Sequence, residues 1–140
     1  MAKAAEMVYE NFDTLYNKTI SMRDIFIQEV LNDVPKSHLN GSLICRLCNN
    51  VSITFEGVPG EEAVAMLDMH GVTCSSGSAC NTGDANPSHV LTSVGATPEY
   101  ASQTLRFTLS DLNTPDEIYY AIEIIKRDIE TLRALHGVLR

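Results

Sequence analysis

The sequence predicts an α+β fold in which helices pack on one face of a small β-sheet. Two stretches, 51–55 and 104–110, alternate apolar and polar residues with the period of a strand that has one buried face. A third stretch, 115–132, places apolar residues at the spacing of an amphipathic helix. With 140 residues, of which 44% are hydrophobic, the chain is long enough for one core, and we expect a single domain over 1–140.

An acidic composition narrows the classes of function. The chain has 10 Lys and Arg against 18 Asp and Glu, a formal net charge of -8, and its basic residues are scattered. Nucleic-acid and anionic-membrane surfaces use clustered basic residues, so we expect neither partner. No apolar run approaches the roughly 18 residues of a membrane span, and acids stand in the first 20 residues. We therefore expect a cytoplasmic protein, whose four cysteines are reduced, metal-bound or catalytic instead of paired in structural disulfides.

Residues 3–34 are expected to form one long helix. Apolar residues recur at helical spacing with charged residues between them, and Pro35 ends the pattern. The apolar positions are Ala5, Val8, Phe12, Leu15, Met22, Phe26 and Val30. Because the helix begins without a capping residue, we interpret it as part of a longer element.

Short elements follow in the middle of the chain. The expected strands are 38–40, 51–55 and 72–74, and the expected helices are 61–70 and 88–94. Gly71 would end the first of these helices in a left-handed conformation. The second would begin at Asn86-Pro87, a capping residue followed by proline, and would end at Gly95.

A long loop between these two helices contains the first candidate for chemistry. Residues 74–84 are small or turn-forming, too polar for a core and too flexible for a regular element. Cys80 lies mid-loop without a bulky neighbour, whereas Cys74 is expected to close a strand. A reactive cysteine needs an accessible thiolate, and loops of this length often have a function. A surface linker with an incidental cysteine is the alternative.

Arg106 is the second candidate, because it is the only charged residue in the strand at 104–110. It shares one strand face with Thr104 and Thr108, while leucine and phenylalanine occupy the other. Such an arginine needs either solvent or an anion, and its planar guanidinium suits a carboxylate. From the residues alone, solvent is the favoured partner of the Arg106 guanidinium, and an anion is the alternative.

The helix that begins at Pro115 has the clearest start signal in the sequence. Thr114 and Glu117 form a capping box, with proline at the first helical position. Its apolar stripe consists of Ile118, Ala121, Ile122, Ile125, Ile129 and Leu132.

Cys45 and Cys48 form a Cys-x-x-Cys motif that could bind zinc or cycle as a dithiol. Zinc ribbons repeat this spacing, but Cys74 and Cys80 are separated by five residues. The motif also precedes a strand instead of opening a helix whose N-terminus would favour a thiolate. We therefore expect no metal site and interpret the pair as incidental.

Several runs of the sequence resemble the C-terminal small domain of NifS/IscS-type cysteine desulfurases. The run at 75–80, Ser-Ser-Gly-Ser-Ala-Cys, resembles the long-loop branch of that family. The runs that carry the resemblance are 49–57, 60–62, 67–69, 75–80, 87–91 and 105–110. It implies the small-domain fold of fold-type I pyridoxal-phosphate transferases, with 1–34 as a linking helix and 35–140 as the body, including a mobile cysteine loop at 75–86.

The same resemblance implies a pyridoxal-phosphate enzyme that converts L-cysteine to L-alanine. Cys80 would take the sulfur as a persulfide and pass it to an iron-sulfur scaffold or another acceptor, and Arg106 would hold the substrate carboxylate. The other implied partners are an N-terminal, cofactor-binding large domain and a second copy in a homodimer. Cutting the small domain from the large one should expose an apolar patch along the first helix.

The sequence also departs from the family. Relatives carry the cofactor on a lysine beside a histidine in the large domain, and none of the four lysines here follows a histidine. We therefore expect no cofactor bound to this chain and no activity of the chain alone. A stand-alone persulfide carrier is the alternative function, although Arg106 would have no use in one. A structural zinc domain is less favoured.

Overall fold

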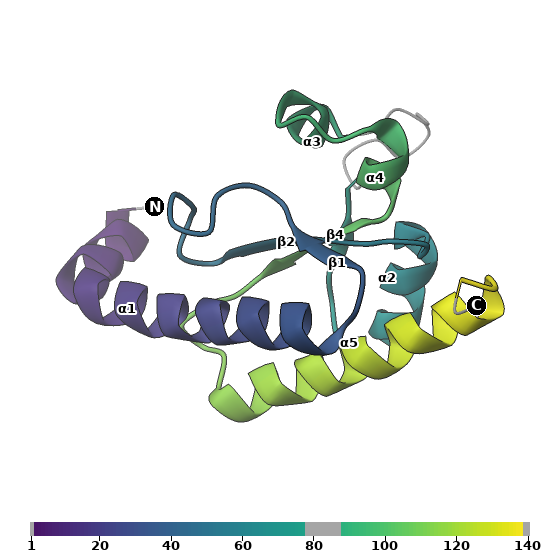
Figure 1. Cartoon of the computed structure of the whole chain (residues 1–140). Helices are drawn as coiled ribbons and strands as arrows, with labels where there is room; N and C mark the ends of the chain where they lie inside the picture. The colour runs from purple at the N-terminus through teal and green to yellow at the C-terminus, as the bar shows by residue number, and fades with distance from the viewer. Residues whose placement is uncertain (1, 78–87, 139–140) are drawn as a thin grey trace.

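An antiparallel sheet lies at the centre of the computed structural model, which describes residues 2–77 and 88–138 (Figure 1). Within these residues the sheet has four strands in the order β1-β2-β4-β3. The elements are α1 (Ala2–Asp33), β1 (Ser37–Leu39), β2 (Asn50–Phe55), α2 (Gly60–Met69), β3 (Ser75–Ser76), α3 (His89–Ser93), α4 (Pro98–Ser102), β4 (Thr104–Thr108) and α5 (Pro115–Leu135). The α+β prediction is confirmed, and every predicted element except the strand at 72–74 overlaps an observed one.

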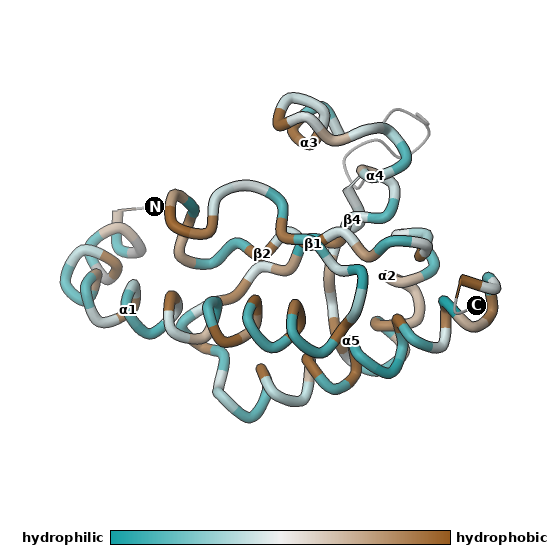
Figure 2. Tube along the Cα trace, viewed as in Figure 1, coloured by the Kyte–Doolittle hydropathy of each residue, from teal (hydrophilic) through white to brown (hydrophobic). Residues whose placement is uncertain are grey.

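The register of β2 and β4 separates an apolar face from a polar face. Val51 pairs with Phe107 and Ile53 with Leu105, and all four side chains are buried. These residues form one core with the apolar stripes of α1 and α5, which run along one side of the sheet (Figure 1). Apolar residues recur along both helices between hydrophilic ones, as amphipathic packing requires (Figure 2). The opposite face of β2 and β4 is polar and is available for a site.

The predicted strand at 72–74 is wrong, because this segment completes the cap of α2. The amide of Val72 donates to the carbonyl of Leu67 (2.9 Å), and the amide of Gly71 donates to Asp68 (3.0 Å). This pattern is a Schellman cap, with Gly71 at φ +78° as predicted. Pairing with β4 begins only at Ser75, so the first two residues of the predicted cysteine loop form β3. Gly77 follows β3 in a turn, and the remainder of that loop, 78–86, lies outside the described residues.

Two short helices, α3 and α4, stand over the polar side of the sheet (Figure 1). The predicted cap at Asn86 lies outside the described residues, and Ser88 is the N-cap of α3. The helix ends at Ser93, one residue before the predicted end, and Gly95 follows the C-cap Val94 with the positive φ (+93°) expected of a residue that terminates a helix. The sequence prediction missed α4, which Thr97 caps through its side chain.

In the C-terminal part of the chain, the predicted start of α5 and the predicted end of β4 can be compared with the structure. The capping box of α5 is confirmed: the amide of Glu117 donates to Thr114 Oγ1 (3.3 Å), and the amide of Thr114 donates to Glu117 Oε2 (2.9 Å). β4 ends at Thr108 instead of residue 110, although Leu109 still donates its amide to Asn49 (3.0 Å). No helix in the described part of the chain is long and apolar enough to cross a membrane.

Candidate functional site

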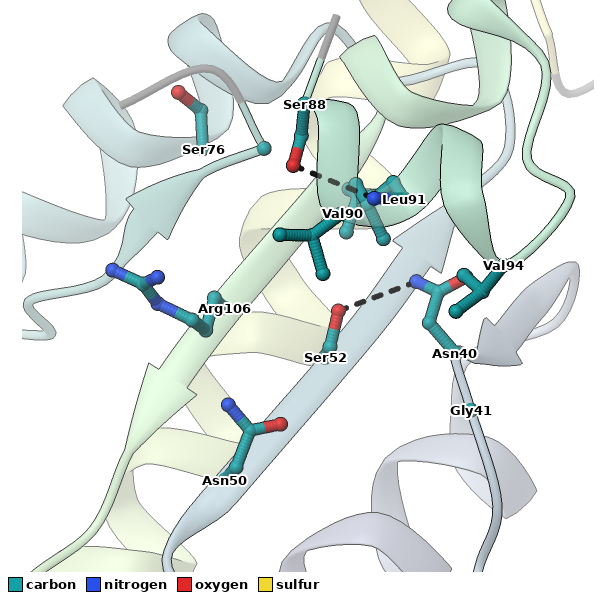
Figure 3. A pocket seen from close by; sticks show the side chains of 12 residues that line it. Asn40, Gly41, Asn50, Ser52, Ser76, Ser88, Val90, Leu91, Val94 and Arg106 are labelled. Atoms are coloured by element: carbon teal, nitrogen blue, oxygen red, sulfur yellow. Dashed lines mark hydrogen bonds between the residues drawn. The ribbon is translucent and has the colours of Figure 1, made fainter. Parts of the chain in front are cut away.

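A cleft of about 280 Å³ lies between the polar face of the sheet and α3 (Figure 3). Strand residues form its floor, and apolar side chains of α3 form one wall. The lining residues are Asn40, Gly41, Asn50, Ser52, Ser76, Gly77, Ser88, Val90, Leu91, Val94, Thr104 and Arg106. The cleft therefore gathers residues from five separate parts of the sequence.

Arg106 is the only charged side chain among the described residues that line the cleft. It lies on β4 directly opposite Ser52 of β2 and opposite Ser75 of β3, and its side chain is exposed. Within the described residues, its guanidinium makes no hydrogen bond or ion pair. Because no acid among the described residues pairs with it, this cation is free of described partners and suits an anion that enters the cleft.

Cys80 lies outside the described residues, but both ends of its segment line the cleft. Gly77 precedes the segment and Ser88 follows it, and both contribute to the lining. The amide of Gly77 donates to the carbonyl of Thr104 (2.9 Å), which fixes the start of the segment to β4. The segment that contains Cys80 therefore leaves the described structure at the cleft and rejoins it there.

Hydrogen bonds hold the floor and one rim of the cleft. Asn40 Nδ2 donates to Thr54 Oγ1 (3.0 Å), and Thr104 Oγ1 donates to the carbonyl of Tyr100 (2.9 Å). Arg46 donates to the carbonyl of Asn50 (3.3 Å) and to that of Asn40, so it fixes the loop between β1 and β2. The sequence analysis missed these residues, although threonines on the polar face of two predicted strands were a signal for them.

The other three cysteines lie outside this cleft. Cys45 is exposed and Cys48 is half-buried in the loop between β1 and β2. Cys74 packs against the core, and burial, followed by the nearby Asp68 carboxylate, raises the pKa of its thiol to about 12. Among the described residues, no three His, Cys, Asp or Glu side chains gather as metal ligands.

Pyridoxal phosphate forms a Schiff base with a lysine, so the positions of the four lysines decide whether this chain could hold it in this way. Lys3 forms an ion pair with Glu6, and Lys126 forms ion pairs with Asp33 and Glu123. The Lys18 ammonium donates a hydrogen bond to the carbonyl of Asp111. The fourth, Lys36, is exposed in the turn after α1. Because none of the four lines the cleft, the chain's own residues do not fit the cofactor there, and we assign it no place in this chain.

Comparison with known proteins places this fold and cleft in a class. No family model matches the chain. The solved structure of a NifS-like protein from Rickettsia africae matches with a TM-score of 0.75 and 26% identity, over 86% of this chain and 31% of that one. The architecture is therefore that of a domain of NifS-like proteins.

Sequence similarity points to one group of proteins within that class. Cysteine desulfurase IscS of Dictyoglomus turgidum is 36% identical over 96% of this chain, and IscS of Methanosarcina thermophila is 35% identical over 95%. The matched regions are 34% and 33% of those proteins, so the chain spans about a third of the length of these curated relatives. The chain is thus similar to a C-terminal part of the NifS/IscS-like cysteine desulfurases, and the predicted resemblance is confirmed.

Proposed function

We propose that this chain is the part of a cysteine desulfurase that binds the substrate carboxylate through Arg106 and accepts its sulfur on Cys80. The single observation that carries the proposal is the guanidinium of Arg106, which has no partner among the described residues, in a cleft to which both ends of the Cys80 segment connect. The similarity to proteins named cysteine desulfurase supports the same assignment.

Arg106 has the chemistry that an amino-acid carboxylate requires. A guanidinium presents two parallel N–H donors that match the two oxygens of a carboxylate. Every other lining residue among those described is uncharged, so a bound carboxylate meets no repelling acid in the cleft. The aliphatic wall of α3 reduces the water around the pair and so strengthens the attraction.

Chain connectivity brings Cys80 within reach of the same cleft. It follows Gly77 by three residues, and three residues span at most roughly 11 Å. In the proposed reaction the C–S bond of L-cysteine breaks, the sulfur bonds to Cys80, and the carbon takes a proton. L-cysteine and the Cys80 thiol thereby become L-alanine and a Cys80 persulfide, which balances atoms and electrons.

The remaining machinery would come from outside these 140 residues. Pyridoxal phosphate, which would supply an electron sink to the substrate, would be held by an N-terminal large domain. The persulfide would pass to an iron-sulfur scaffold or another acceptor, in a cytoplasmic enzyme that acts as a homodimer. A stand-alone persulfide carrier is less well supported, because it gives no role to Arg106 in the cleft.

A chimeric enzyme tests the proposal directly. This chain would replace the matching third of Dictyoglomus turgidum IscS, and alanine release from L-cysteine would be measured with the cofactor bound. We expect activity in the chimera, a large rise in KM for L-cysteine in Arg106→Lys, and no persulfide in Cys80→Ser. Arg127→Lys makes the same chemical change on α5, outside the cleft lining, and serves as the matched control.

Two outcomes would contradict the proposal. An unchanged KM in the Arg106→Lys chimera would contradict the assignment of Arg106 to the substrate carboxylate, because lysine cannot reproduce the bidentate geometry. A Cys80→Ser chimera that still accumulates protein persulfide would remove the acceptor role. The cofactor's absorption band must be present in each variant, so that a chimera that fails to assemble is recognised.

A further inference from the structure

The polar side chains that line the cleft differ in whether they already have a partner. Of the seven polar side chains in the described lining, five are engaged in hydrogen bonds or other polar interactions. The five engaged residues are Asn40, Ser52, Ser76, Ser88 and Thr104. The other two, Asn50 and Arg106, have side chains without a partner among the described residues. A ligand that enters the cleft therefore meets the Asn50 amide as well as the Arg106 guanidinium.

Asn50 and Arg106 lie on the same polar face, on adjacent strands. Arg106 of β4 pairs directly with Ser52 of β2, and Asn50 precedes Ser52 by two residues, so Asn50 and Arg106 are diagonal neighbours across the strands. Diagonal neighbours lie about 7–8 Å apart, which is within reach of long side chains. Figure 3 shows both side chains on the cleft face of their strands. A group of the size of a carboxylate can therefore contact both of them.

Backbone hydrogen bonds fix Asn50 at the start of β2. Its amide donates to the carbonyl of Leu47 (3.4 Å), and its carbonyl accepts from the Arg46 guanidinium (3.3 Å). The same guanidinium donates to the carbonyls of Asn40 (2.6 Å) and Ser42 (2.7 Å), so the preceding loop is held as well. Because this backbone is already ordered, a ligand that binds here has only the Asn50 side chain to order, which keeps the entropic cost of binding low.

A neutral amide beside an arginine suits a carboxylate better than a second charged residue would. A carboxylate has about four lone-pair sites, and a bidentate guanidinium fills only two of them. The Asn50 amide can donate to a third without altering the single positive charge of the described lining. An acidic residue in its place would pair with Arg106 and repel the carboxylate.

We propose that Asn50 is a second binding residue for the substrate carboxylate, and that its side-chain N–H donates to one carboxylate oxygen while Arg106 binds both. This inference rests on the proposed function, because it assigns Asn50 to the same ligand as Arg106. Donors from two strands fix the orientation of the carboxylate, which a single guanidinium leaves able to rotate. Asn50 thereby helps to set the direction in which the rest of the amino acid extends.

The Dictyoglomus turgidum chimera with its cofactor bound tests the proposal through binding alone. L-alanine, the product of the proposed reaction, and ethylamine, which is L-alanine without its carboxylate, are each titrated while the absorption band of the cofactor is followed. In Asn50→Ala we expect the dissociation constant of L-alanine to rise about tenfold or more, because a hydrogen bond to a charged group is lost. In the isosteric Asn50→Asp variant it should rise at least about 100-fold, because the added carboxylate repels that of the ligand.

Two controls separate loss of carboxylate binding from a general change of the cleft. The dissociation constant of ethylamine should be unchanged in Asn50→Ala, since ethylamine has no carboxylate to bind. Asn32→Asp makes the same chemical change at an exposed position of α1 outside the cleft lining, and should leave the affinity for L-alanine unchanged.

The outcomes distinguish this inference from the proposed function on which it rests. If Arg106→Lys weakens L-alanine binding but neither Asn50 variant does, the role of Asn50 is wrong and that of Arg106 stands. Equal weakening of L-alanine and ethylamine in Asn50→Ala would likewise overturn the role of Asn50, because the carboxylate would not be what it recognises. An unchanged affinity for L-alanine in Arg106→Lys, or no binding of L-alanine by the unmodified chimera, would overturn both.

Discussion

The hydroxyl oxygens of Thr54 and Thr104 lie 2.7 Å apart across β2 and β4, and both side chains are buried. Thr104 donates to the carbonyl of Tyr100, and Thr54 accepts from Asn40 Nδ2. Four groups, from the residue after β1 and from β2, α4 and β4, thus form one continuous series of donors and acceptors beneath the cleft. This series connects the rim at Asn40 with the helix against which Gly77 packs.

Removal of either hydroxyl alone should lower the free energy of unfolding by more than half of the loss caused by removal of both. We expect Thr104→Val to reduce the free energy of unfolding by about 1–3 kcal/mol, because the buried Thr54 hydroxyl loses its acceptor. Thr54→Val should behave similarly, and the double variant should be less destabilised than the sum of the singles. Urea denaturation of the four proteins measures this coupling. Additive losses would show that the two hydroxyls do not depend on each other.

The elements that were predicted correctly carry their signals locally. The strands at 51–55 and 104–108 alternate residue by residue, and the capping box at Thr114 and Glu117 spans only four positions. Such patterns report which face is buried and where a helix begins, without knowledge of the partner. They were sufficient for the α+β fold and for Arg106 on the polar face of its strand.

The misses have two physical causes. Strand β3 was misplaced because Val72 donates its amide to the α2 cap instead of the ladder, and the sequence pattern could not show that competition. Helix α4 has only five residues, too few for an apolar stripe, although Thr97-Pro98 repeats the start signal of α5. The cleft depends on register and on α3, so other residues that line it with Arg106, such as Asn40 and Ser76, could not be predicted from spacing.

Gly77→Ala should destabilise the chain through a steric contact. A Cβ at this position would lie 2.5 Å from the carbonyl oxygen of Ala101, so β3 and α4 must move apart. We expect a loss of about 1–3 kcal/mol in the free energy of unfolding. Gly71→Ala is the control, because a Cβ there meets nothing within 4 Å and only the positive φ opposes it, at a cost of about 1–2 kcal/mol.

The Gly77 contact also predicts a local effect at the cleft. Displacement of the Gly77 amide should weaken its bond to Thr104 and shift the Arg106 resonances in an NMR spectrum of the chain. Gly71→Ala should leave these resonances in place. If the two variants perturb Arg106 equally, Gly77 has no special role in the position of the cleft wall.

The capping box of α5 should make stability depend on acid pH. The Thr114 amide, and then the Asn113 side chain, lower the pKa of Glu117 by hydrogen bonding to its carboxylate. A lowered folded pKa means that the stabilisation is present above the ordinary pKa of about 4.5 and is lost as pH falls through the folded value. Thermal melts between pH 6 and pH 3 should therefore show a smaller decline for Glu117→Gln than for the unmodified chain. Identical declines would contradict this role.

The purified chain should form no specific Schiff base with pyridoxal phosphate. Three of its lysines are engaged in hydrogen bonds or ion pairs, and none of the four lines the cleft. After gel filtration of an equimolar mixture, we expect no aldimine absorption band above that of an unrelated lysine-containing protein. A stoichiometric band that borohydride removes, and that maps to one lysine, would show that this chain binds the cofactor itself.

The four thiols should differ in their rate of alkylation, with Cys80 the fastest and Cys74 the slowest. Cys80 follows small residues and a glycine, so reagents reach it, whereas Cys74 packs against the core. Since the pKa of the Cys74 thiol is raised to about 12, its thiolate fraction at pH 8 is only about 10⁻⁴.

Timed reaction with iodoacetamide, followed by peptide mass analysis, ranks the thiols. Between pH 8 and pH 10 the Cys74 rate should rise about tenfold per unit, because pH stays below its pKa and each unit multiplies its thiolate fraction by ten. Exposed Cys45 supplies the internal reference for access. A Cys74→Ala variant should leave the Cys80 rate unchanged, since burial and not competition makes Cys74 slow. If Cys74 reacts as fast as Cys45 at pH 8, the interior position of Cys74 is wrong. If Cys80 reacts more slowly than Cys45, accessibility does not distinguish Cys80 as the sulfur acceptor.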